Sequence, residues 1–100
     1  MAEGERRLMA ARMVWKVPLT DPVEVVRLPL GAWTVHVAQQ DPERPWPTVW
    51  VEVDPDQPEI DVMFQVVGTG QPIATGAHHV GSVLTAGGAL VWHVYEVPLG

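Results

Sequence analysis

Hydrophobic and polar residues alternate along most of this chain, in short valine-rich runs separated by proline, glycine and aspartate. An alternation with a period of two is typical of β-strands that bury one face, and β-branched and aromatic residues fit such strands. No internal stretch sustains the period of about 3.6 residues that indicates a helix. The pattern predicts strands at residues 13–17, 23–28, 33–39, 48–53, 60–67, 79–85 and 89–97.

The same alternation predicts which side chains share a face. In the third run, Trp33, Val35 and Val37 are expected on one side of the strand, with Thr34 and His36 on the other. The last run is hydrophobic on both sides, which is typical of a strand that is covered twice. Five tryptophans in 100 residues also exceed what a small core easily hides, and tryptophan is enriched at interfaces. We therefore expect a second copy of the chain to supply the additional cover, in a homo-oligomer.

The length and the pattern together predict the fold class. One hundred residues are enough for one domain with one core. We expect an all-β fold, a small antiparallel sandwich or barrel of about six to seven strands, over residues 13–100. Residues 1–12 lie outside the β pattern and are expected to form a flexible or short helical extension.

The distribution of charge narrows the function classes. The net charge is −6, and four of the six basic residues lie at or before Lys16. From residue 17 onward the chain has two basic residues, Arg27 and Arg44, and ten acidic ones. Nucleic-acid binding requires clustered lysine and arginine, so it is not expected. The sequence has no cysteine and no long apolar run, which favours a reducing cytoplasm and no membrane span.

The glycine-rich segment "GTGQPIATG" (68–76) is the stretch that most resembles a binding loop. It lacks the lysine of a phosphate-binding P-loop and the third glycine of a dinucleotide fingerprint. We interpret it as a turn between strands that requires a positive φ at Gly68 or Gly70. The alternative is a small anion-binding nest of backbone N–H groups.

The histidines, acids and serine give no pattern typical of a metal or catalytic site. His78 and His79 are adjacent, so on a strand they point to opposite faces, whereas His36 and His93 can meet only if their strands pair. The segment "DPDQPEID" (54–61) departs from a calcium-binding loop at its glycine and final glutamate positions and is expected to be a turn. Ser82, the only serine, does not lie in a nucleophile elbow. We expect no enzyme activity, catalytic residue, metal or cofactor.

The order of several segments resembles a family of small, uncharacterised phage-encoded proteins. These segments are "VWKVPL", "LPLGAWTVHVAQQ", "VWVEVDPDQP", "FQVVGTGQPI", "HHVGSVL" and "GGALVWHVYEV", and they span residues 13–97. The GTG and GGxLVWHV motifs are the most specific, whereas His79 stands where a tyrosine is expected. The resemblance implies a viral accessory protein that acts in the cytoplasm of an infected bacterium, and it implies no activity.

Small viral proteins without catalytic groups act mostly by binding, which leaves three readings open. The first is a sponge that sequesters a small ligand, such as a nucleotide immune signal of the host. The others are an interaction module that inhibits a host protein and a component of the virion or its assembly. For the sponge, aromatic walls can stack a base, arginines can clamp a phosphate and glycine-rich backbone can donate N–H groups. The candidate ligand-binding residues are Arg27, Trp33, Arg44, Trp50, Gly68, Thr69, Gly70 and Trp92.

Overall fold

The computed structural model describes residues 12–97 and Leu99. The extension expected over residues 1–12 therefore lies, except for Arg12, outside the described residues. The strands are β1 (Met13–Pro18), β2 (Val23–Pro29), β3 (Trp33–Ala38), β4 (Thr48–Val53), β5 (Glu59–Gly68), β6 (His78–Thr85) and β7 (Leu90–Val97). A single 3₁₀ turn, η1 (Ala86–Gly88), joins β6 to β7.

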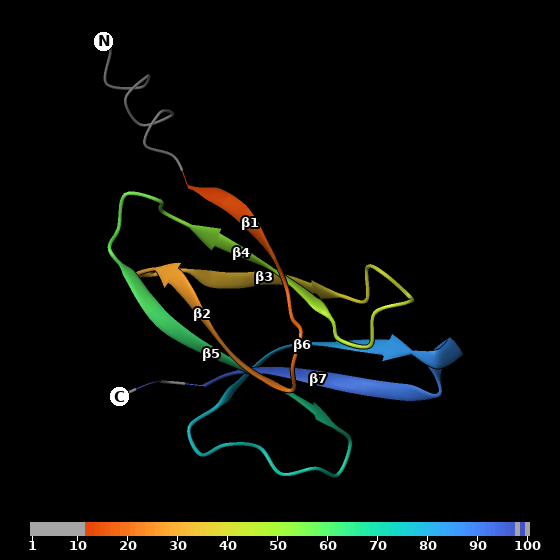
Figure 1. The fold of residues 1–100 in the computed structure, drawn as a ribbon. Helices are drawn as coiled ribbons and strands as arrows, with labels where there is room; N and C mark the ends of the chain where they lie inside the picture. The colour runs from red at the N-terminus through yellow and green to blue at the C-terminus, as the bar shows by residue number, and fades with distance from the viewer. Residues whose placement is uncertain (1–11, 98, 100) are drawn as a thin grey trace.

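The seven strands form two antiparallel sheets (Figure 1). The first contains three strands in the order β1-β4-β3, and the second contains four in the order β2-β5-β7-β6. Every observed strand end lies within one residue of its predicted position. The prediction of an all-β antiparallel fold is thus confirmed. None of the described residues forms a helix long and apolar enough to cross a membrane.

The hydrophobic core lies where the inner faces of the two sheets meet. β4 contributes alternate valines, β5 contributes Phe64, and β7 contributes Val94. The fully or nearly fully buried members of the cluster are Leu19, Leu28, Val49, Val51, Val53, Phe64, Val66 and Val94. Alternate side chains of β4 and β5 therefore point into the core, as expected for strands that bury one face.

The two sheets approach most closely between β3 and β6. An atom added at the Cβ position of Gly81 on β6 would lie 2.5 Å from Cγ2 and 2.8 Å from Cβ of Val37 on β3. Real Cβ atoms essentially never come closer than 3.0 Å to another heavy atom. Glycine at this position therefore allows the two backbones to lie side by side (Figure 1).

A β-bulge in β3 changes the faces expected from the alternation. The register with β4 shifts between Thr34 and His36, which leaves Val35 without a direct partner. Trp33 lies opposite Glu52 on the outer face and is 60% exposed, whereas Val37 lies opposite the buried Val49. The prediction that Trp33 and Val37 share a face is therefore wrong, because the extra residue of a bulge inverts the alternation beyond it.

The connection over residues 69–77 crosses the second sheet. It leaves β5 and enters β6, and these strands lie on opposite sides of β7. The Ala74 N–H donates to Oε1 of Gln65, and Thr69 Oγ1 lies 3.1 Å from Nε2 of His93. Both partners belong to the outer face of the sheet, and Figure 1 shows the loop on the side away from the three-stranded sheet. The chain itself thus supplies part of the cover expected for β7, and a second subunit stays a prediction.

Candidate functional site

A hollow lies at the end of the sandwich where β6 turns into β7. Its volume is about 520 Å³, which falls in the usual range for small-molecule sites. Two predicted binding residues from distant parts of the chain, Arg44 and Trp92, both line it. The Trp92 Nε1–H donates to Thr85 Oγ1 at 3.1 Å, and the Trp46 ring packs against the indole at a centroid distance of 6.2 Å. The indole is therefore held in one orientation.

Arg44 and Arg27 differ in whether their guanidinium groups already have an acidic partner. Nη1 of Arg27 lies 3.1 Å from Oδ1 of Asp61, and its Nε lies 3.9 Å from Glu59. Within residues 12–97 and Leu99, the guanidinium of Arg44 makes no ion pair. The hollow therefore contains a cation that a ligand can use, whereas Arg27 lies outside it and is already neutralised.

The GTG segment forms an adjoining hollow of about 300 Å³, and Leu90 and Trp92 line both hollows. Gly68 and Thr69 line the smaller one, but the Gly68 N–H donates to Gln71 Oε1 at 2.6 Å. Gly70 has a φ of 89°, as predicted for a turn at this position. The segment is thus a turn, and the N–H of Gly68 is already bonded.

The other two predicted binding residues lie on a different surface. Trp33 and Trp50 occupy the outer face of the three-stranded sheet, where the Trp50 ring lies 5.2 Å from that of His36. His36 and His93 belong to different sheets, so their strands do not pair. The described residues contain no group of three or more histidines and acids that could hold a metal ion.

A chain of polar side chains on the outer face of β6 and β7 was not predicted from the sequence. Ser82 Oγ lies 2.8 Å from Nε2 of His79 and 2.9 Å from Nδ1 of His93. Nε2 of His93 in turn lies 3.1 Å from the hydroxyl of Thr69. The His79 ring meets the Tyr95 ring edge-on at 5.4 Å, so an aromatic contact forms where a tyrosine was expected. These hydrogen-bonded side chains connect loop 69–77 to both strands.

The register of the β6–β7 hairpin explains this cluster. The short turn at 86–89 places Thr85 opposite Leu90 and therefore Ser82 opposite His93. A bulge between His79 and Gly81 then shifts His79 to the face of Ser82 and turns His78 toward Glu96. A serine beside an imidazole is the starting point of nucleophilic catalysis, but the second nitrogen of His93 faces a hydroxyl and not a carboxylate. Because the Ser82 hydroxyl proton can be donated to only one of the two imidazoles, the tautomers of His79 and His93 are coupled through Ser82.

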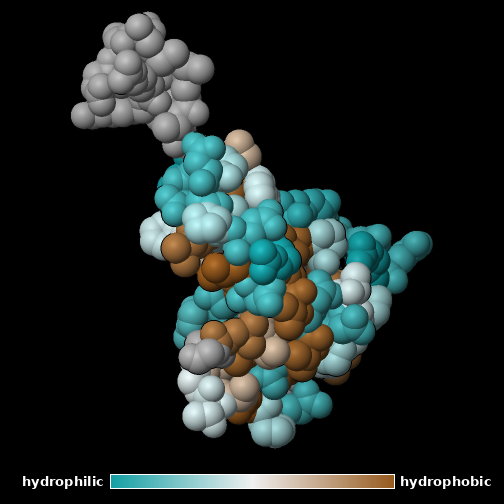
Figure 2. Space-filling model, turned by 60° about the vertical axis from the view of Figure 1, so that its left-hand side comes forward, coloured by the Kyte–Doolittle hydropathy of each residue, from teal (hydrophilic) through white to brown (hydrophobic). Residues whose placement is uncertain are grey.

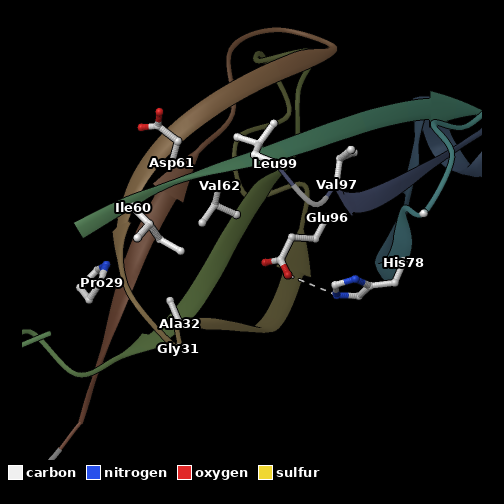
Figure 3. A pocket seen from close by; sticks show the side chains of 11 residues that line it. Pro29, Gly31, Ala32, Ile60, Asp61, Val62, His78, Glu96, Val97 and Leu99 are labelled. Carbon is white, nitrogen blue, oxygen red and sulfur yellow. Dashed lines mark ion pairs between the residues drawn. The ribbon is translucent and has the colours of Figure 1, made fainter. Parts of the chain in front are cut away.

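A third cavity lies at the opposite end of β7 (Figure 3). Its volume is about 260 Å³, and most of its lining side chains are apolar. The Glu96 carboxylate points from β7 toward His78, whose Nε2 lies 3.2 Å from Oε2 of Glu96. Burial raises the pKa of Glu96, and the proximity of His78 lowers it by a smaller amount. A desolvated carboxylate therefore lies at an apolar cavity.

The comparison with known families covers the whole β domain. A family model described as a domain of unknown function, DUF7352, matches residues 10–99. The chain belongs to the DUF7352 family. All seven strands of this DUF7352 domain, both hollows beside Trp92 and the Glu96 carboxylate lie within the matched residues. No curated protein and no solved structure matches the chain.

The Glu96 site of the DUF7352 domain predicts a pH dependence of stability. Because the pKa of Glu96 is raised on folding above its ordinary value of 4.5, the folded chain keeps a proton that the unfolded chain loses first. The free energy of unfolding should thus decrease as the pH rises from about 4.5 through the folded-state pKa. His78 and Asp61 are the other titratable groups at this cavity. Glu96→Gln should remove this decrease in denaturant melts at a series of pH values. Glu43→Gln, at an exposed loop position, is the control, and an unchanged slope in Glu96→Gln would contradict the assignment.

Proposed function

We propose that this DUF7352 protein is a non-enzymatic accessory protein of a phage that sequesters a small aromatic anion in an infected bacterium. A nucleotide immune signal of the host is the ligand class that best fits. In this proposal the base stacks on Trp92 and the phosphate binds Arg44. The resemblance to phage-encoded proteins supports the setting, and the hollow beside Trp92 supports the mode of action.

The observation that carries the proposal is the meeting of Arg44 and Trp92 in one hollow. Arg44 lies in the loop between β3 and β4, and Trp92 lies on β7 of the other sheet. An aromatic plane can stack a base, and a guanidinium that makes no ion pair within the described part of the chain can bind its phosphate. The chain is acidic, so its overall field does not favour anions, and Arg44 provides the local positive charge.

An interaction module that inhibits a host protein is the alternative. The outer face of the three-stranded sheet supports it, because Val14, Trp33 and Val35 are all more than half exposed there. Exposed tryptophan is typical of binding hot spots. Trp46, in contrast, packs against the core and presents little surface to a partner. The same exposed face is available to a second copy of the chain in a homo-oligomer.

Replacing Arg44 by alanine should weaken nucleotide binding by about tenfold to hundredfold, because a charge-assisted contact to phosphate is lost. Isothermal titration calorimetry with cyclic dinucleotides and mononucleotides as probes measures the effect. Arg27→Ala is the matched control, because its guanidinium is paired with acids on another part of the surface. Equal loss in both variants would indicate a general charge effect and would overturn the assignment of the hollow. If the wild type and both variants all fail to bind these nucleotides, the proposed ligand class is wrong.

A further inference from the structure

The cavity beside Glu96 lies at the open end of the sandwich, between the first residues of β5 and the last residues of β7 (Figure 3). Its apolar lining side chains are Pro29, Ala32, Ile60, Val62, Val97 and Leu99. Figure 2, in which the left side of Figure 1 is turned forward, shows hydrophobic side chains reaching the surface between hydrophilic ones on this side. A volume of about 260 Å³ suits a ligand with one ring or a short alkyl chain.

The charges around this cavity are unbalanced toward the negative side. No lysine or arginine among residues 12–97 and Leu99 lines it, and Asp61 on the opposite wall is held by Arg27. Glu96 is the remaining acid, and its side chain is 20% exposed, whereas that of His78 is 64% exposed. A carboxylate that has lost much of its hydration is stabilised by a positively charged group.

One oxygen of this carboxylate is available to a ligand. His78 contacts Oε2, and no donor among residues 12–97 and Leu99 contacts Oε1. In Figure 3 the carboxylate lies between His78 on one side and Ala32, Ile60 and Val62 on the other. A ligand can therefore contact the apolar wall and the free oxygen without displacing His78.

We propose that this cavity binds a small amine with an apolar body, whose ammonium group donates to Oε1 of Glu96. The apolar body displaces water from the walls formed by β2, β5 and the end of β7, and this burial supplies part of the affinity. The site lies at the other end of β7 from the Arg44 hollow and binds the opposite charge. It does not depend on the proposed nucleotide function.

Titration of the full chain with phenethylamine, followed by ¹H–¹⁵N NMR at neutral pH, tests this site. The expected result is saturable shifts around Glu96, Ile60 and Leu99. The alcohol 2-phenylethanol has the same apolar body without the charge. Its affinity should be lower than that of the amine by at least about tenfold. This comparison uses only the wild-type chain, so it does not require any variant to fold.

Two variants separate this site from the rest of the molecule. Glu96→Gln should lower the affinity for the amine by about tenfold or more, whereas Arg44→Ala should bind the amine as the wild type does. Equal affinity for the amine and the alcohol, an unchanged affinity in Glu96→Gln, or no saturable shift at millimolar amine would overturn the proposal. Loss of nucleotide binding in Arg44→Ala does not affect the proposed amine site, so the two proposals can fail independently.

Discussion

Replacing Phe64 by alanine should lower the free energy of unfolding by about 3–5 kcal/mol. Phe64 is fully buried and is the largest fully buried side chain of the core. It lies on β5, which pairs with β2 on one side and β7 on the other, so neighbouring side chains on both strands lose contacts to it. A domain of this kind is stable by only about 5–15 kcal/mol, so the variant should lose a large part of its stability.

Chemical denaturation followed by far-UV circular dichroism measures this loss. Val25→Ala is the matched control, because Val25 lies on the neighbouring strand β2 with its side chain on the exposed outer face. It should cost less than about 1 kcal/mol. If the two substitutions cost the same, Phe64 would not lie at the centre of the core described above.

Replacing Gly81 by alanine should cost about 1–3 kcal/mol, although alanine suits a strand at least as well as glycine does. The new Cβ would lie 2.5 Å from Cγ2 of Val37, so β3 and β6 must move apart. Gly81 does not have a positive φ, so backbone strain does not contribute. The loss of stability in Gly81→Ala therefore measures how closely the two sheets pack at this position.

A double-mutant cycle with Val37→Ala isolates this contact. Val37→Ala removes both methyl groups, which lie 2.5 Å and 3.6 Å from the added atom, and leaves the Cβ at 2.8 Å, so it relieves part of the overlap. In that background, Gly81→Ala should cost less, by at least about 0.5 kcal/mol. Additive costs in denaturant melts would show that β6 and β3 do not meet at these residues.

The strands could be predicted because each one carries its signal locally. In β4 the valines at 49, 51 and 53 are buried while Trp50 and Glu52 face outward, and this period of two is visible in the sequence. The prolines, glycines and aspartates that interrupt the runs lie at the observed turns. These features depend on neighbours along the chain and not on which strands pair.

The bulges in β3 and β6 could not be predicted in the same way. A bulge adds one residue to one strand, and nothing in a valine-rich run identifies which residue is added. In β6 it decides that His79 joins Ser82 and that His78 joins Glu96. Both contacts involving these histidines therefore depend on a register that the sequence does not state.

Part of the candidate site was within reach of the sequence. The turn between β6 and β7 is short, and a short hairpin turn fixes the register, so the sequence predicts that these two strands pair. The observed pairing of Ser82 with His93 depends on the turn including Ala89, whereas the predicted strand 89–97 would place Ser82 opposite Trp92. Arg44 and Trp92 could be named as candidates by chemistry alone. Their meeting in one hollow depends on how the loop between β3 and β4 packs against the end of β7, which local patterns do not determine.

The central claim is that the hollow formed by Arg44 and Trp92 holds a small nucleotide-like ligand. Native mass spectrometry of the chain purified from phage-infected bacterial cells, before and after denaturation, tests it most directly. We expect the wild-type chain to release a mass of nucleotide size that Arg27→Ala retains and Arg44→Ala lacks. A small molecule retained equally by Arg44→Ala, or a wild-type chain that carries a host protein and no small molecule, would contradict it.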